Sequence, residues 1–276
     1  MKLTGKVAVV TGGGGVLCGC MAKALACDGA KVAVLSLRQE SADAVAKEIA
    51  DQGGQAVAIA CNVLEQSSVI AAKDEVLKAF GQVDILINGA GGNNPKANTT
   101  GEIFDPADVD NPDAASFFDL GLEGFKAVFD LNFIGSFLTS QVFCKEMLGR
   151  SGVIINISSV SAPSPMTKVP AYSAAKAAIE NFTQWMAVHM APANIRVNAI
   201  TPGFFLTNQN RRLLLDAEGN YTERSKKILS HTPMGRFGKP EDLVGAMLWL
   251  VDNNTSAFVT GIAVPVDGGF LAYSGV

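Results

Sequence analysis

Runs of hydrophobic residues with the length of a strand alternate along the whole chain with segments in which hydrophobic residues recur with helical period. The first run, Lys6–Thr11, is continuous, as expected for a strand that is buried on both faces. The other predicted strands are Lys31–Leu35, Gln55–Ala60, Asp84–Asn88, Gly152–Ile157, Ile195–Ile200 and Ile262–Val266. The predicted helices are Met21–Asp28, Ser41–Asp51 (with Ser41 as its N-cap), Val69–Phe80, Ala171–His189 and Glu241–Val251. This alternation predicts an α/β fold, a single doubly wound domain with a parallel sheet of about seven strands and helices on both faces.

Two long segments interrupt this rhythm without dividing the domain, which we expect to span residues 1–276. The first, about 93–118, is rich in Pro, Asn, Thr and Asp, and the second covers about 204–232. Each follows the carboxyl end of a predicted strand, where ligands bind in open parallel sheets. Because long loops in compact domains are usually functional or disordered, we interpret the first as an insertion loop and the second as a substrate loop.

Composition and charge exclude several classes of protein. The 276 residues are 48% hydrophobic with a net charge of −4, which excludes a disordered chain. A sequence pI near 5.3 argues against a nucleic-acid partner, and the first long uncharged stretch, Val7–Ala22, is interrupted by glycines and too short to span a membrane. Five cysteines without a CxxC pair predict reduced thiols and a cytoplasmic protein, and two isolated histidines offer no metal site.

A glycine cluster, Thr11–Gly19, separates the first strand from the first helix. Glycines let a backbone approach a pyrophosphate closely, and a helix N-terminus supplies unpaired N–H groups and a positive dipole end. The alternative is an ordinary glycine-rich turn. The position favours a dinucleotide site, with contacts from Gly12, Gly15, Val16 and Leu17.

The second strand is expected to end near the adenosine ribose of that dinucleotide. An acidic residue there would bind the ribose hydroxyls and repel a 2′-phosphate. This chain instead has Ser36 and Arg38, which suit a phosphate, so NAD(P)(H) is predicted with NADP(H) favoured over NAD(H). Arg38 as a solvated surface charge is the alternative.

Tyr172 and Lys176 are four residues apart on a predicted helix, so that both side chains lie on one face. A nearby ammonium favours the phenolate, and we expect it to lower the pKa of Tyr172 from about 10 toward neutrality, where tyrosine can exchange a proton with a substrate hydroxyl. Ser159, at the end of the preceding strand, supplies a hydroxyl donor for a developing alkoxide.

Together these motifs resemble the short-chain dehydrogenase/reductase family over Lys6–Gly269. Thr11–Gly19 is similar to its TGxxxGxG loop, residues 88–91 (Asn-Gly-Ala-Gly) to its NNAG motif, and Asn132 to its helix Asn. Ser159, Tyr172 and Lys176 match its Ser and YxxxK positions. Further matches are Pro202–Thr207 with PGxxxT, and Val259–Gly261 and Val266–Gly269 with the C-terminal signature.

The resemblance implies a Rossmann fold and hydride transfer between nicotinamide C4 and a carbonyl or secondary alcohol. Tyr172 would be the acid/base, Ser159 would bind the substrate oxygen, Lys176 would also hold the nicotinamide ribose, and Asn132 would hold a proton-relaying water. Further cofactor contacts implied are Asn62, Val63, Asn88, Ala90, Gly91, Pro202, Gly203, Phe205 and Thr207. Related enzymes are commonly dimers or tetramers, so a homo-oligomer is expected, with a small molecule as substrate.

This chain departs from the family pattern in two places. Val16 and Cys18 stand where the loop has its last two glycines, so their backbone must keep a negative φ or bear strain. Asn62 stands where an acid is expected near the adenine, and its carbonyl can still accept a hydrogen bond.

The two long loops indicate the class of substrate. Asn93 in the first, and Asn208, Gln209, Asn210, Arg211 and Arg212 in the second, suit a polyhydroxylated substrate that carries a carboxylate. The long insertion and the run from Phe204 to Arg211 are also similar to short-chain-type D-mannonate oxidoreductases (fructuronate reductases). The predicted substrate contacts are Asn93, Ser159, Asn208 and Arg211.

Two other functions stay open. A 3-oxoacyl carrier-protein reductase would use the same chemistry on an acyl thioester. A sensor that binds a dinucleotide without turnover is less compatible with the complete set Asn132, Ser159, Tyr172 and Lys176.

Overall fold

The computed structural model describes residues 1–207 and 211–275. Within them, seven parallel strands form one sheet in the order β3-β2-β1-β4-β5-β6-β7. The strands are β1 (Val7–Thr11), β2 (Lys31–Ser36), β3 (Gln55–Ala60), β4 (Ile85–Asn88), β5 (Val153–Ile157), β6 (Arg196–Pro202) and β7 (Ala263–Val266). The order reverses direction between β1 and β4, so the doubly wound fold is confirmed.

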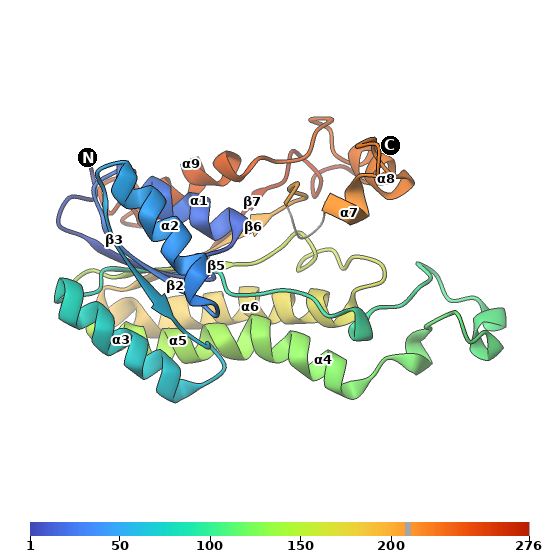
Figure 1. Ribbon diagram of the computed structural model, residues 1–276, viewed down its shortest axis with the longest axis horizontal. Helices are drawn as coiled ribbons and strands as arrows, with labels where there is room; N and C mark the ends of the chain where they lie inside the picture. The colour runs from blue at the N-terminus through green and yellow to red at the C-terminus, as the bar shows by residue number, and fades with distance from the viewer. Residues whose placement is uncertain (208–210, 276) are drawn as a thin grey trace.

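Helices connect consecutive strands and cover both faces of the sheet (Figure 1). They are α1 (Val16–Cys27), α2 (Gln39–Asp51), α3 (Gln66–Phe80), α4 (Leu122–Phe129), α5 (Gly135–Phe143), α6 (Pro170–Met190), α7 (Arg211–Leu214), α8 (Glu223–Ser230) and α9 (Val244–Val251). One prediction was wrong in detail: α2 begins at Gln39 with Arg38 at its N-cap, so Ser41 lies inside the first turn.

Alternate residues of the central strands build two separate cores. Ala8 and Val10 of β1 pack with α1, α2 and α9, whereas Val7 and Val9 pack with α3, α5 and α6. All four side chains are at most 1% exposed. Burial on both faces explains why the strand is hydrophobic throughout rather than alternating with polar residues.

One continuous helical stretch, Leu122–Met147, is long and apolar enough to cross a membrane by length and composition alone. Half of its apolar window is buried inside the protein. Thr139 and Ser140 of this stretch hydrogen-bond with Asn88 of β4 (2.7 and 2.8 Å). These are the features of a core helix that packs against the sheet.

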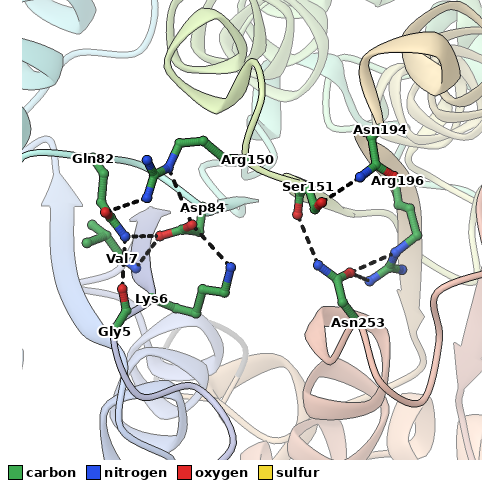
Figure 2. A network of polar contacts seen from close by, with 10 residues as sticks. All are labelled: Gly5, Lys6, Val7, Gln82, Asp84, Arg150, Ser151, Asn194, Arg196 and Asn253. Carbon is green, nitrogen blue, oxygen red and sulfur yellow. Dashed lines mark hydrogen bonds and ion pairs between the residues drawn. The ribbon is translucent and has the colours of Figure 1, made fainter.

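Charged side chains are paired at the amino-terminal edge of the sheet (Figure 2). The Asp84 carboxylate accepts hydrogen bonds from the Val7 N–H (2.9 Å), Gln82 Nε2 (2.6 Å) and Lys6 Nζ (3.3 Å). Arg196 donates to Asn253 Oδ1 (2.7 Å) and to the carbonyl oxygens of residues 250 and 259. Each buried charge therefore has partners within the protein, as burial requires.

The opposite edge carries the two long excursions. The insertion contains the 3₁₀ helices η1 (Pro95–Ala97), η2 (Pro106–Asp110) and η3 (Phe117–Asp119). We call residues 99–119 the arm; it is the green segment that reaches beyond the rest of the chain in Figure 1. Its turns are capped locally, since Asp105 caps η2 and a capping box of Ser116 and Asp119 begins η3.

Candidate active site

The glycine loop brings free backbone donors to the carboxyl end of β1. Gly12 has a φ of +65°, and a Cβ there would come within 2.8 Å of the Gly89 carbonyl oxygen. Helix α1 begins at Val16 after Gly15, and no side chain caps its first turn. Uncapped N–H groups at the start of a helix fit a pyrophosphate, so the loop suits the predicted dinucleotide. Leu17, in the same first turn, is partly buried against the core.

The two departures in this loop are accommodated without backbone strain. Val16 and Cys18 lie inside α1, and neither has a positive φ. The Cys18 thiol is buried against Gly89, where a Cβ would overlap the Cys18 Sγ. Gly89 itself replaces the second Asn of the NNAG pattern. The bulkier residue at position 18 and the smaller one at position 89 therefore compensate for each other.

The structure brings the predicted catalytic residues together where β5 meets α6. Lys176 Nζ donates to the Ile157 carbonyl oxygen (2.8 Å) and lies 5.6 Å from the centroid of the Tyr172 ring. A hydrogen bond joins Tyr172 and Ser159. The Ser159 hydroxyl oxygen also accepts from the Ser161 N–H (3.2 Å). Phenol, hydroxyl and ammonium thus share one site.

The electrostatics of this site differ from the sequence-based expectation. Burial lowers the pKa of Lys176 to about 8. Burial also raises the pKa of Tyr172, and the hydrogen bond with Ser159 only partly offsets that rise. The prediction that neighbouring groups of the protein lower the Tyr172 pKa is therefore wrong. The reason is that desolvation disfavours both charged forms, while the ammonium donates to a backbone carbonyl rather than to the phenol.

Asn132 lies in a π-helical turn, Asp130–Ile134, between α4 and α5. Its amide nitrogen donates to the carbonyl oxygens of Gly92 (2.7 Å) and Val128 (2.8 Å), and its Oδ1 accepts from the Gly92 N–H (3.3 Å). A Cβ at Gly91 would lie 2.6 Å from Asn132 Oδ1 and 3.3 Å from Lys176 Nζ. Asn132 therefore fixes the chain that leaves β4 beside Lys176. The predicted water contact stays a prediction.

The residues predicted to bind the adenosine half lie at the ends of β2 and β3. A Cβ at Gly14 would come within 2.9 Å of Ser36 Oγ, so Ser36 faces the glycine loop. The Arg38 side chain is exposed. Asn62 is engaged locally, because its Nδ2 donates to Glu65 Oε1 (2.8 Å) and its Oδ1 accepts from the Leu64 N–H (3.1 Å).

The remaining predicted cofactor contacts are more enclosed. Asn88 is 2% exposed, and its Nδ2 donates to Ser140 Oγ (2.8 Å) and Asn156 Oδ1 (2.9 Å). Only its backbone is left to contact a ligand. Val63 is buried, and the Ala90 N–H donates to Thr11 Oγ1 (3.2 Å).

The chain that leaves β6 meets the C-terminal signature. Pro202 ends β6, and the Gly203 N–H donates to the Val266 carbonyl oxygen (3.0 Å). A Cβ at Gly203 would lie 2.7 Å from the Asp267 Cα, so glycine permits this close approach. Phe205 is buried and Thr207 is partly buried.

The structure describes three of the four residues predicted to contact the substrate. Asn93 Nδ2 donates to Asn98 Oδ1 (3.0 Å), which stabilises the chain after β4. Arg211 is the exposed first residue of α7. Asn208 lies outside the described residues.

Sequence reasoning missed one residue beside the predicted catalytic residues. Glu180 Oε1 accepts hydrogen bonds from Ser158 Oγ (2.8 Å) and Thr201 Oγ1 (2.9 Å). The Glu180 carboxylate thus links the ends of β5 and β6 to α6. Its spacing of four residues from Lys176 places it on the same helical face and could have identified it.

A groove of about 890 Å³ runs between α1, α2 and residues 240–244. Gly14, Val16 and Arg38 line its rim, but Tyr172 does not. The convergence of Ser159, Tyr172 and Lys176, rather than the size of this groove, identifies the candidate active site.

Comparison with known proteins agrees with this geometry. A family model described as short chain dehydrogenase matches residues 6–217. The chain is 59% identical to the uncharacterized oxidoreductase UxuB of Bacillus subtilis (strain 168), over all of this chain and 98% of that protein. It is 34% identical to a 3-oxoacyl-[acyl-carrier-protein] reductase of Synechocystis, over 98% of this chain and 99% of that protein.

A solved structure is also similar to this chain over its whole length. A crystal structure from Haemophilus influenzae, named "putative D-Mannonate oxidoreductase" and containing bound NAD, matches with a TM-score of 0.95 and 54% identity. The match covers 99% of this chain and 98% of that one. The chain therefore belongs to the short-chain dehydrogenase/reductase family. It is an oxidoreductase of that family with a dinucleotide-binding Rossmann fold.

Proposed function

We propose that this enzyme interconverts a ketone and a secondary alcohol of a sugar acid, of the D-fructuronate/D-mannonate type, with NAD(P)(H). The convergence of Ser159, Tyr172 and Lys176 at the carboxyl edge of the sheet carries the oxidoreductase part of this proposal. The name of the Haemophilus relative supports the substrate class.

The protein groups have distinct parts in the reaction. The bound dinucleotide supplies or accepts the hydride. During reduction the Ser159 hydroxyl donates a hydrogen bond to the carbonyl oxygen, and the Tyr172 phenol gives it a proton. With a pKa of about 8, Lys176 stays mostly protonated at pH 7, and its charge favours the phenolate that remains.

A basic segment supports an acidic substrate. Seven basic residues lie between positions 211 and 239, after the carboxyl end of β6: Arg211, Arg212, Arg224, Lys226, Lys227, Arg236 and Lys239. Only three acidic residues lie in the same segment, so it is net positive. A carboxylate would be attracted to this side of the site.

For the cofactor, we propose that NADP(H) is accepted and preferred. Ser36 stands where an acid would repel a 2′-phosphate, and the exposed Arg38 guanidinium can pair with one. Because the Haemophilus structure contains NAD, the two dinucleotides must be compared directly.

We also propose a cytoplasmic homo-oligomer, dimer or tetramer. Trp185 and Val188 of α6 are 58% and 78% exposed, which leaves an apolar face for a second copy.

The test is a titration with NADH and NADPH, followed by rates on D-fructuronate, on D-fructose as its neutral counterpart, and on a 3-oxoacyl thioester. We expect a preference for D-fructuronate and tighter binding of NADPH. Reduction of the thioester alone would instead select a 3-oxoacyl carrier-protein reductase, a function that the Synechocystis relative supports. Tighter binding of NADH would contradict the NADP preference without affecting the substrate proposal.

A further inference from the structure

Glu102 of the arm lies among cations from two other segments of the chain. Its carboxylate forms an ion pair with Lys227 of α8. The hydrogen bond with Lys227, and then the charges of Lys227, Lys168 and Arg224, lower the pKa of Glu102. Two of these cations belong to α8, and the third precedes the catalytic helix.

Lys168 is in a constrained position next to the site. It has a φ of +71°, in the left-handed region that non-glycine residues rarely adopt. Its carbonyl oxygen accepts a hydrogen bond from the Thr99 N–H of the arm (3.1 Å). It lies four residues before Tyr172. Strain of this kind persists where the surrounding structure holds it, and it concentrates at functional sites.

The four residues come from three segments that follow β4, β5 and β6. Figure 1 shows that the arm, the chain before α6 and α8 all lie on the side where these strands end. The same side carries Ser159, Tyr172 and Lys176. The cations therefore belong to segments on the same side of the sheet as the proposed catalytic residues.

We propose that Lys168, Arg224 and Lys227 bind the carboxylate of the substrate, and that Glu102 holds this position until the substrate carboxylate replaces it. This inference rests on the proposed function, because it requires an acidic substrate. It identifies a second anchor, separate from Ser159 and Tyr172, that distinguishes a sugar acid from the matching neutral sugar. No other carboxylate of the arm has an ion pair within the described residues, so Glu102 is the arm group that competes.

The alternative is a simple latch, in which the Glu102–Lys227 pair only fastens the arm. Two substitutions separate these cases, because both break the same ion pair. Glu102→Gln removes the competitor, whereas Lys227→Met removes part of the binding site. A latch predicts that the two variants behave alike, while a carboxylate site predicts opposite effects.

We expect Glu102→Gln to lower the KM for D-fructuronate by roughly two- to fivefold and Lys227→Met to raise it by a similar factor, as for partly exposed ion pairs. The kcat and the KM for D-fructose should stay within about twofold in both variants. Asp105→Asn, on the arm, and Lys47→Met, which breaks the exposed ion pair with Asp51 on α2, are controls that change the same charges without touching the Glu102–Lys227 pair. Neither should change the KM for D-fructuronate.

A binding measurement without turnover separates this inference from the proposed function. D-mannonate and its neutral counterpart D-mannitol are titrated calorimetrically into the enzyme saturated with reduced dinucleotide. If the unmodified enzyme neither binds D-mannonate nor reduces D-fructuronate, the proposed function fails. If it does both, but Glu102→Gln and Lys227→Met shift affinity in the same direction, the carboxylate site is wrong and the function stands. Opposite shifts confined to D-mannonate support the site.

Discussion

The two edges of the sheet use polar residues in opposite ways. At the amino-terminal edge, Asp84 accepts hydrogen bonds from three groups, and Arg196 is surrounded by acceptors (Figure 2). At the carboxyl edge, Lys176 donates one hydrogen bond within the described residues, to the Ile157 carbonyl oxygen. The Ser161 hydroxyl nearby is the buried side-chain group without a partner among the described residues.

This difference separates polar groups that are paired within the fold from those to which we assign a role in the proposed reaction. Asp84 has cationic and N–H partners that offset the cost of its burial, whereas Lys176 is desolvated without an acidic partner and its pKa falls to about 8. The catalytic role that we propose for Lys176 gives a reason for this cost at the carboxyl edge. The contrast predicts that substitutions at the two edges will affect stability and activity in opposite senses.

The largest expected effect belongs to the phenol. Tyr172→Phe should lower kcat by about a thousandfold or more, because the phenylalanine ring has no hydroxyl group to give a proton to the substrate oxygen. Dinucleotide affinity, measured by fluorescence titration, should change little. Tyr273→Phe is the control and should keep normal turnover. Activity of Tyr172→Phe within tenfold of the unmodified enzyme would disprove the acid/base role.

Lys176→Met should lose activity and gain stability. The pKa of Lys176 is lowered on folding, so between pH 8 and 10.5 the unfolded chain binds more protons and stability rises with pH in that window. At pH 7 the full cost of the buried charge is present, and removing it should raise the free energy of unfolding by about 1–3 kcal/mol. Urea unfolding at pH 7 and pH 9.5 measures both effects. Lys78→Met, at an exposed position, should change neither, and a Lys176→Met protein less stable at pH 7 would contradict the argument.

Asp84→Asn, at the amino-terminal edge of the sheet, should lose stability and keep its activity. The amide cannot accept from all three donors as a charged group does, so the free energy of unfolding should fall by about 2–3 kcal/mol. The rate at saturating substrate, measured well below the unfolding temperature, should stay near normal. A loss of turnover in folded Asp84→Asn protein would show that the two edges are not independent.

The smallest effect concerns the contact between Cys18 and Gly89. Gly89→Ala should cost about 1–2 kcal/mol, because the added Cβ overlaps the Cys18 sulfur. Cys18→Ala in the same chain should recover most of that loss, so the double-mutant cycle should show a coupling energy above about 0.5 kcal/mol. Additive effects would mean that the two positions do not compensate for each other.

Local sequence patterns were sufficient to predict the strands, the glycine loop and the proximity of Tyr172 and Lys176. A strand buried on both faces is continuous in its apolar residues, and two residues four apart on a helix share a face wherever that helix lies. Short-range geometry of this kind depends only on neighbouring residues. The N-cap of α2 was misplaced because Ser41 has a suitable side chain but the helix begins two residues earlier, at Gln39.

Packing between distant parts of the chain decided which side chains contact each other and how deeply each is buried. Cys18 and Gly89 are separated by 71 positions, and the side chain of Asn88 turns toward Ser140 and Asn156 rather than toward a ligand. The direction of the Tyr172 pKa shift also depended on tertiary structure, because desolvation is set by every group that packs around the phenol. Likewise, Glu102 acquired its cationic neighbours only when segments from three strand ends met. Contacts and burial of this kind have no period along the chain, so only the folded protein reveals them.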